Sequence, residues 1–279
     1  MSSLGQRILT TVITVPALFL IIFFLPYYGF LVLTVVAMLT TALATAELKE
    51  LYFKAEGARI HFPSWMAALL PFSQWLELTI FPQLPLLELT LVVMALAIYT
   101  TELTFGPKDA YAKTFSRIGG ASLLLIYPGL LLTFIIRLTA LNHASTFLLL
   151  FFLLVFGNDV FAFLFGMSFG KNNRGIMLVS PNKSVAGFVG GILSTVALAV
   201  AFCLFYPGVG EMVSIPQALL LGFLTSISAN IGDLIESAYK RAANVKDSGH
   251  IIPGRGGLLD SIDSMLASAP VYWLLLKLF

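Results

Sequence analysis

Long apolar stretches with few charges follow one another along nearly the whole chain of 279 residues. A helix needs roughly 20 apolar residues to cross a bilayer, because each residue adds about 1.5 Å towards a hydrocarbon thickness of about 30 Å. A bilayer offers no water to unpaired backbone groups, so such stretches must be helical. Nine of them can be read: 8–25, 28–46, 64–81, 86–104, 118–141, 146–166, 187–206, 216–236 and 262–278. We therefore predict an all-α, polytopic membrane protein with about nine transmembrane helices.

The composition excludes the common soluble classes of protein. Hydrophobic residues make up 58% of the chain and charged residues 11%, whereas a soluble domain is about 45–50% apolar and about 25% charged. This balance excludes a soluble enzyme, a nucleic-acid-binding module and a disordered chain. Cys203 is the sole cysteine, so an intrachain disulfide and a CxxC metal motif are excluded as well.

Basic residues are distributed unevenly between the loops that join these stretches. One set of alternate loops carries all but two of the 16 Lys and Arg residues, and the other carries only Arg137 and Lys277. Because positive loops stay in the cytoplasm, we expect a cytoplasmic N-terminus and an external C-terminus. The first stretch is interpreted as a retained span rather than a signal peptide, since a second follows at once. The expected location is a bacterial cytoplasmic membrane.

Charged side chains gather towards the C-terminal end, where nine fall between Asp233 and Asp263. Before them, polar residues recur every three or four positions, as on one face of a helix: Ser226, Asn230, Asp233, Ser237 and Lys240. Lipid would penalise this stripe, so it must face a water-filled cavity or the protein interior. The alternative is an ordinary interfacial helix end, in which Lys240 and Arg241 anchor among the headgroups.

A glycine-rich loop, Pro253-Gly254-Arg255-Gly256-Gly257, follows that stripe. Glycines let the backbone approach a ligand closely, and the helix expected to begin near Asp260 would add its positive end. Carboxylates bind a hard divalent cation, and basic side chains bind the phosphate oxygens that coordinate it. The residues of this predicted metal–phosphate site are Asp233, Lys240, Arg241, Lys246, Asp247, Arg255, Asp260 and Asp263.

A second polar island lies earlier in the chain. Asn158 and Asp159 interrupt an apolar stretch, and Ser180-Pro181-Asn182-Lys183-Ser184 occupies the next basic loop. An intramembrane aspartate is a functional candidate, although burial against a hydrogen-bond partner is the alternative. We expect one integral membrane domain over 1–279, in which 1–141 form a scaffold and 142–279 carry the catalytic machinery.

At these residues the chain resembles the phosphatidate cytidylyltransferases, or CDP-diacylglycerol synthases. Their signature S-x-x-K-R-x4-K-D-x-G-x3-P-G-H-G-G-x-x-D-R-x-D is matched from Ser237 to Asp263, and the preceding G-D-L-x-E from Gly232 to Glu236. Segments 159–171 and 180–187 resemble D-x-x-A-Y-x-x-G-x-x-F-G-[KR] and S-P-x-K-[TS]-x-x-G. Three positions depart from the pattern: Arg255 replaces His, Ser261 replaces Arg, and Ala186 replaces an acidic residue.

The resemblance implies an enzyme of phospholipid biosynthesis that converts CTP and phosphatidate to CDP-diacylglycerol and pyrophosphate. It implies that Asp233 and Asp260 bind Mg²⁺, with a second cation left open. Basic side chains would bind phosphate: Lys240, Arg241 and Lys246, with Lys183 and Arg255 contributing. The remaining assignments are metal, orienting or substrate-binding roles for Asp159, Ser237, Asp247, Gly256, Gly257 and Asp263. The implied partners are CTP, the lipid phosphate and membrane lipids; no nucleic acid is expected, and a homodimer is left open.

Three alternatives remain at this point. A CTP-dependent lipid kinase would use similar contacts but transfer the γ-phosphoryl group and release CDP. A divergent or silent paralogue is suggested by Arg255 and Ser261. A transporter would need polar residues across the bilayer and often an inverted repeat, and the sequence shows neither.

Overall fold

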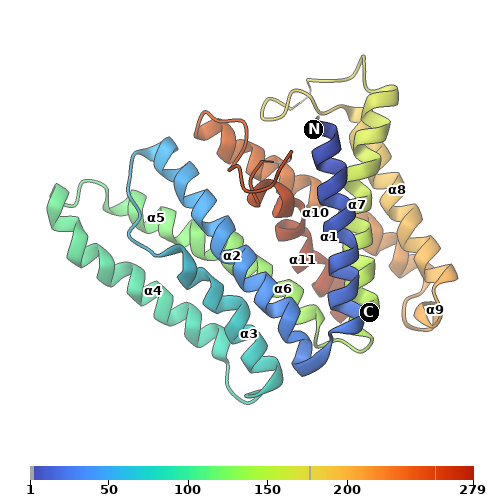
Figure 1. The fold of residues 1–279 in the computed structure, drawn as a ribbon, viewed down its shortest axis with the longest axis horizontal. Coiled ribbons are helices and arrows are strands. Elements are labelled where there is room, and N and C mark those ends of the chain that lie inside the picture. Colours follow the sequence, from blue (N-terminus) through green and yellow to red (C-terminus); the bar gives the residue numbers. More distant parts are fainter. Residues whose placement is uncertain (1–2, 176, 255) are drawn as a thin grey trace. The chain divides into compact units, whose positions relative to one another are not determined.

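The computed structural model describes residues 3–175, 177–254 and 256–279, and Figure 1 shows them as a succession of helices. The α-helices are α1 (Ser3–Phe24), α2 (Tyr27–Glu56), α3 (Leu69–Thr79), α4 (Leu86–Phe105), α5 (Thr114–Leu124), α6 (Leu131–Leu138), α7 (Ala144–Phe169), α8 (Val185–Phe205), α9 (Val209–Met212), α10 (Ile215–Ala242) and α11 (Leu259–Leu278). Shorter turns of other helix types are η1 (Ser64–Ala68), η2 (Gly106–Asp109) and η3 (Leu125–Leu130). The predicted all-α fold is confirmed for these residues.

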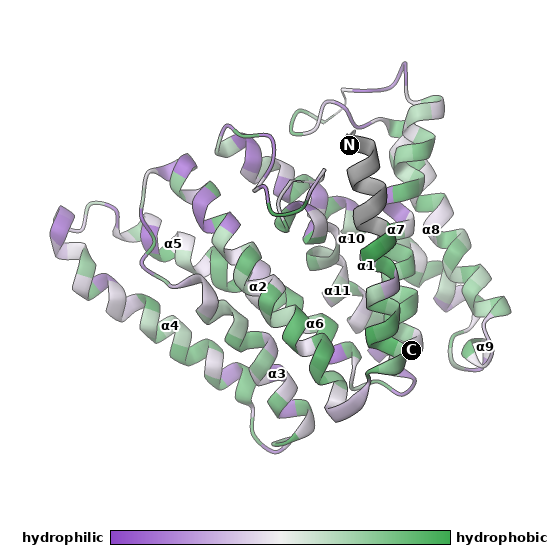
Figure 2. Ribbon diagram, viewed as in Figure 1, coloured by the Kyte–Doolittle hydropathy of each residue, from purple (hydrophilic) through white to green (hydrophobic). Residues whose placement is uncertain are grey.

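Six helical segments in the described part of the chain are long and apolar enough to cross a membrane. They are α2, α4 with η2, the continuous run from α5 to α6, α7, α8 and α10. The protein is therefore a polytopic integral membrane protein. Figure 2 shows hydrophobic residues along the middle of α2 and α4 and hydrophilic residues at the ends of both helices. All nine predicted stretches coincide with helical residues, whereas the count of nine spans and the sides of the termini remain predictions.

The third predicted stretch, 64–81, contains only a short α-helix. It forms η1 and then α3, whose 11 residues extend about 16 Å. Gln74 of α3 is buried, and its Oε1 accepts a hydrogen bond of 2.6 Å from Nε of Arg137. The helix packs against α2, α4 and α6. Gln74 is thus a buried polar residue whose amide oxygen has a hydrogen-bond partner.

The chain divides into two compact units. Unit 1 comprises Met1–Ser145 and Tyr239–Ile262, and unit 2 comprises Thr146–Ala238 and Asp263–Phe279. Most of the C-terminal signature thus belongs with the N-terminal helices that were expected to be scaffold. Asp233, Ser237 and Asp263 belong to unit 2.

Each unit has its own tightly packed interior. In unit 1, the buried guanidinium of Arg117 on α5 bonds both Glu102 and Asp109 at 2.6 Å, which fixes the connection from α4 to α5. In unit 2, the fully buried Tyr272 packs against Phe151 of α7 and donates a 2.9 Å hydrogen bond to the carbonyl of residue 147.

Helices α7 and α8 pack closely at their glycines. A Cβ on Gly187 of α8 would lie only 2.7 Å from the carbonyl oxygen of Ala162 and 3.4 Å from Cα of Gly166, both on α7. Small residues permit such contact between helix backbones. These glycines therefore let the backbones of α7 and α8 approach each other.

Candidate active site

In unit 1 the signature is organised around the carboxylate of Asp260, in the first turn of α11. Its Oδ1 accepts a 2.6 Å bond from Nζ of Lys240 at the end of α10. Its Oδ2 accepts three bonds of 2.8 Å, from the backbone N–H and hydroxyl of Ser248 and from the N–H of Gly257. The Asp260 side chain is 8% exposed. Two of the predicted site residues, Lys240 and Asp260, are thus in direct contact.

A second buried carboxylate, Glu47 of α2, binds the same loop. Its Oε1 accepts from the N–H of Leu258 at 2.9 Å, and its Oε2 accepts from the N–H of Leu259 at 2.8 Å. Oε2 also accepts from the Ser248 hydroxyl at 3.2 Å. The first amides of a helix have no partner within it, so Glu47 caps the start of α11.

The sequence analysis assigned no role to Glu47. The available signal was weak: Glu47 is the first charged residue after an uncharged run from residue 27 to residue 46. A carboxylate at that position is equally typical of an ordinary membrane-interface helix end. Only the folded contacts with residues more than 200 positions away identify what it binds.

The glycines of the loop are required by these contacts. A Cβ on Gly257 would overlap the Ser248 hydroxyl and come within 2.5 Å of a Glu47 carboxylate oxygen. Gly256 has a φ of +108°, which other residues rarely adopt. Two backbone hydrogen bonds, of 2.8 and 3.0 Å, join Ile252 to Gly256.

Two of the three positions that depart from the family pattern bear on this loop. Arg255, predicted to bind phosphate, lies outside the described residues. The hydroxyl of Ser261 is buried and has no hydrogen-bond partner within the part of the chain that the structure describes.

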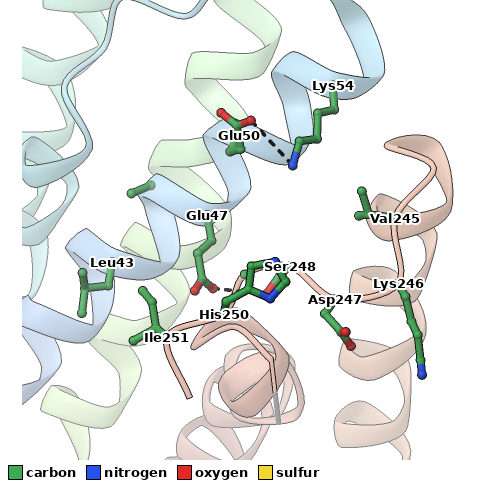
Figure 3. Close-up of a pocket in the computed structure, with 12 residues that line it drawn as sticks. Leu43, Glu47, Glu50, Lys54, Val245, Lys246, Asp247, Ser248, His250 and Ile251 are labelled. Carbon is green, nitrogen blue, oxygen red and sulfur yellow. Dashed lines mark hydrogen bonds and ion pairs between the residues drawn. The ribbon is translucent and has the colours of Figure 1, made fainter. Parts of the chain in front are cut away.

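A cavity of about 610 Å³ lies in unit 1 between α2 and the segment from Val245 to Ile251 (Figure 3). The predicted site residues Lys246 and Asp247 both line it, together with Glu47. Arg241, next to Lys240 at the end of α10, is exposed. Lys246 and Asp247 of the signature therefore border an open space large enough for a substrate group.

In unit 2, the two predicted motif regions meet through an ion pair. Nζ of Lys183, in the loop before α8, lies 2.5 Å from Oδ2 of Asp233 on α10. The hydroxyl of Ser237, one turn along α10, donates to Oδ1 of Asp233 at 3.4 Å. The neighbouring Ser184 caps α8 by accepting from the N–H of Gly187 at 3.1 Å. The loop that carries Lys183 is thereby tied to the start of a helix.

Further carboxylates lie around Asp263, which is 7% exposed on α11. Asp159, Asp233 and Glu236 all act electrostatically on it. The hydroxyl of Ser264 donates to Asp159 at 3.5 Å, and the N–H of Ser264 donates to Asp263 at 2.6 Å. Like charges repel, so a cation among these oxygens would offset their repulsion.

The donor set of this acidic group suits a hard cation such as Mg²⁺, because it consists of carboxylate oxygens. As placed, however, no three His, Cys, Asp or Glu side chains within 3–175, 177–254 and 256–279 are close enough to hold a metal ion together. The two predicted ligands, Asp233 and Asp260, belong to different units. Mg²⁺ binding therefore stays a prediction.

The deeper part of the polar stripe on α10 is bonded within unit 2. Oδ1 of Asn158 on α7 accepts from the Ser226 hydroxyl at 2.5 Å and from Nδ2 of Asn230 at 3.3 Å. Ser226 and Asn230 are buried, so this part of the stripe faces protein, as predicted. Asn158 is itself buried, so its amide oxygen is an acceptor inside unit 2.

Comparison with known proteins extends the similarity from the signature motifs to nearly the whole chain. The pattern of the "Cytidylyltransferase family" matches residues 5–279. A phosphatidate cytidylyltransferase of Bacillus subtilis (strain 168) is 37% identical over 169 residues, which are 60% of this chain and 61% of that protein. The phosphatidate cytidylyltransferase of Staphylococcus haemolyticus (strain JCSC1435) is 38% identical over 125 residues, 45% of this chain and 46% of the relative.

A third relative, "Uncharacterized protein YnbB" of Escherichia coli (strain K12), is 32% identical over 224 residues, 78% of this chain and 72% of its own length. The matches to the two phosphatidate cytidylyltransferases cover less than two thirds of those proteins. The family match, in contrast, runs through both units and all the site residues. This chain belongs to the cytidylyltransferase family.

Proposed function

We propose that this membrane protein transfers the cytidylyl group of CTP to phosphatidate, giving CDP-diacylglycerol and pyrophosphate. The observation that carries the proposal is the pairing of signature cations with signature carboxylates, Lys240 with Asp260 and Lys183 with Asp233. These pairs hold lysines and carboxylates in place for anionic substrates. Family membership and the names of the relatives agree with this reaction.

The chemistry is a displacement at phosphorus. An oxygen of the lipid phosphate attacks the α-phosphorus of CTP, a new P–O bond forms, and the bond to the β-phosphate oxygen breaks as pyrophosphate leaves. Both reactants are anions, so neutralisation of their charge and alignment of the reacting atoms contribute most to catalysis. No covalent enzyme intermediate is needed. We assign the neutralisation to Lys240, Arg241 and Lys246, with Lys183 contributing from unit 2.

We also propose Mg²⁺ as the cofactor. The carboxylates that would hold it are Asp233 and Asp260, with Asp159 and Asp263 orienting them. The grouping of acidic side chains around Asp263 supports this assignment. When bound, the ion would supply positive charge to the phosphates of CTP. The roles of Ser237, Asp247, Gly256 and Gly257 are to hold the loop and the carboxylates in position.

We place the enzyme in a bacterial cytoplasmic membrane, with nine spans, a cytoplasmic N-terminus and an active site open to the cytoplasm. The uneven distribution of Lys and Arg between alternate loops supports this orientation. The acyl chains of the lipid would remain in the bilayer while its phosphate enters the polar site.

Product analysis tests the proposal. Purified protein in detergent is incubated with Mg²⁺, phosphatidate and CTP labelled at either the α- or the γ-phosphorus. We expect the α-label in the lipid and the γ-label in pyrophosphate. The γ-label in the lipid, with release of CDP, would indicate a lipid kinase instead. Absence of transfer to any lipid phosphate would overturn the proposal.

A further inference from the structure

The cavity between α2 and the 245–251 segment has two chemically different ends. Figure 3 shows Leu43 of α2 and Ile251 of the segment near each other at one end. Glu50 and Lys54 of α2 lie at the other end, and Lys246 comes from the opposite wall. Leu43 is 42% exposed and Ile251 is 52% exposed. The cavity therefore presents apolar surface at one end and charged side chains of both signs at the other, where the side chain of Lys246 extends away from Lys54 (Figure 3).

The level of the cavity within the membrane follows from the sequence of α2. Residues 27–46 contain no charge, and Glu47, Lys49, Glu50 and Lys54 follow within the next eight positions. Leu43 lies in the last turn of the apolar run, whereas Lys54 lies three turns further along the helix. The cavity thus spans the level at which the hydrocarbon of a bilayer gives way to headgroups. The acyl ends of a phospholipid would cover Leu43 and Ile251 with hydrocarbon, whereas a nucleotide carries no hydrocarbon chain to do so.

The ammonium group of Lys54, at the polar end, is available to a ligand. Nζ of Lys54 lies 3.6 Å from a carboxylate oxygen of Glu50, and the two side chains are 45% and 59% exposed. Exposed pairs of this kind are weak, so a phosphate can take over the ammonium group. Lys246 is also exposed. Glu47, which binds both Ser248 and the start of α11, holds this wall of the cavity against α2.

We propose that this cavity binds the head of the lipid phosphate, with Lys54 at the phosphate and Leu43 and Ile251 at the first carbons of the acyl chains. The proposal rests on the proposed function for the identity of the lipid. It gives the N-terminal half of the chain a substrate-binding residue, Lys54, outside the signature.

Protection of a cysteine tests the proposal without relying on turnover. Ala46→Cys places a thiol in the cavity wall, and Glu56→Cys places one at the exposed end of α2 outside the cavity, each combined with Cys203→Ser. A short-chain phosphatidate should slow maleimide labelling at position 46 about tenfold at saturation and leave position 56 unchanged. The matching diacylglycerol, which lacks the phosphate, should protect much less.

The other outcomes are informative. Protection of position 46 by CTP with Mg²⁺, and not by phosphatidate, would assign the cavity to the nucleotide and overturn the proposal. Protection by neither, in protein that still synthesises CDP-diacylglycerol, would overturn this inference and leave the proposed function standing. Protection by phosphatidate, in protein that does not synthesise CDP-diacylglycerol, would support this inference and overturn the proposed function.

Kinetics in mixed micelles provide a second test. Lys54→Ala should raise the KM for phosphatidate about tenfold, because one charge-assisted hydrogen bond is lost, with the KM for CTP unchanged. Lys54→Arg should restore most of the affinity for the lipid. Arg59→Ala, which removes an exposed cation near the same end of α2 outside the cavity, is the matched control. An equal rise in lipid KM for Arg59→Ala, or a rise in the CTP KM for Lys54→Ala, would contradict the proposal.

Discussion

Glu47 and Ser248 are 201 residues apart in the chain, yet the Ser248 hydroxyl lies 3.2 Å from a Glu47 carboxylate oxygen. The same hydroxyl lies 2.8 Å from a carboxylate oxygen of Asp260. A hydroxyl has one proton to donate, so Ser248 donates to one carboxylate at a time. The shorter contact, to Asp260, is favoured. The backbone amides of residues 257–259 supply the remaining bonds to the two acids. One serine thus links the N-terminal helices to the signature.

Glu47→Gln should disorganise the start of α11. A carboxamide offers one acceptor oxygen where two are used, and its NH₂ would face a backbone N–H. We expect CDP-lipid synthesis to fall at least about tenfold, the effect of losing a buried bond to a charged group, together with faster hydrogen exchange of the amides of Leu258 and Leu259. Glu56→Gln, at the exposed end of the same helix, is the control. Normal synthesis and exchange in Glu47→Gln would show that the cap has no functional role.

Gly257→Ala tests the close packing of the loop. The added methyl would overlap the Ser248 hydroxyl, so the loop must shift by a few tenths of an ångström or more. We expect a large loss of synthesis, partly recovered in the double variant with Ser248→Ala, which removes the overlapped oxygen. Gly119→Ala is the matched control, because a Cβ there would meet nothing within 4 Å. Equal effects of the two glycine variants would contradict this explanation.

Asp260→Asn should abolish most activity while the protein remains folded and inserted. The amide keeps the shape but cannot accept from Lys240 on one side and from three donors on the other. We expect a drop in kcat of about a hundredfold. Thermal unfolding in detergent and the yield of inserted protein serve as controls for folding. Retention of more than half of the wild-type kcat would be incompatible with this role.

The pair of Lys183 and Asp233 should show energetic coupling. Both side chains are partly exposed, at 27% and 35%, so we expect a coupling of about 1 kcal/mol in kcat/KM for CTP. The cycle uses Lys183→Ala, Asp233→Asn and the double variant, assayed across a Mg²⁺ titration. Asp233→Asn should also raise the Mg²⁺ concentration needed for half-maximal rate. Additive losses and an unchanged Mg²⁺ requirement would argue against both assigned roles.

Orientation can be tested on the loop that holds α9. Glu211 is exposed there, and the nine-span topology puts this loop outside the cell. Glu211→Cys with Cys203→Ser should react with an impermeant thiol reagent added to intact cells. Labelling that requires broken membranes would overturn the proposed orientation.

The helices were predictable because the length and apolarity of a segment are local properties. The stripe on α10 was predictable for the same reason, since its spacing fixes one helix face. The pairing of Lys183 with Asp233 was not predicted, because 50 residues separate them and no periodicity joins them. The role of Glu47 could not be predicted, because its partners are backbone amides, which every residue except proline carries, and no sequence pattern marks those that will need an acceptor.

The capping of α11 by Glu47 limits how the signature can be used in engineering. A fragment that began at residue 142 would carry every residue of the conspicuous motifs and would lack the acid that binds their loop. Grafting the same segment onto foreign helices would transfer its lysines and aspartates without the partner for its first amides. The motif is therefore not portable, and a split version of the protein should function only when the piece containing α2 is supplied with the piece containing the loop.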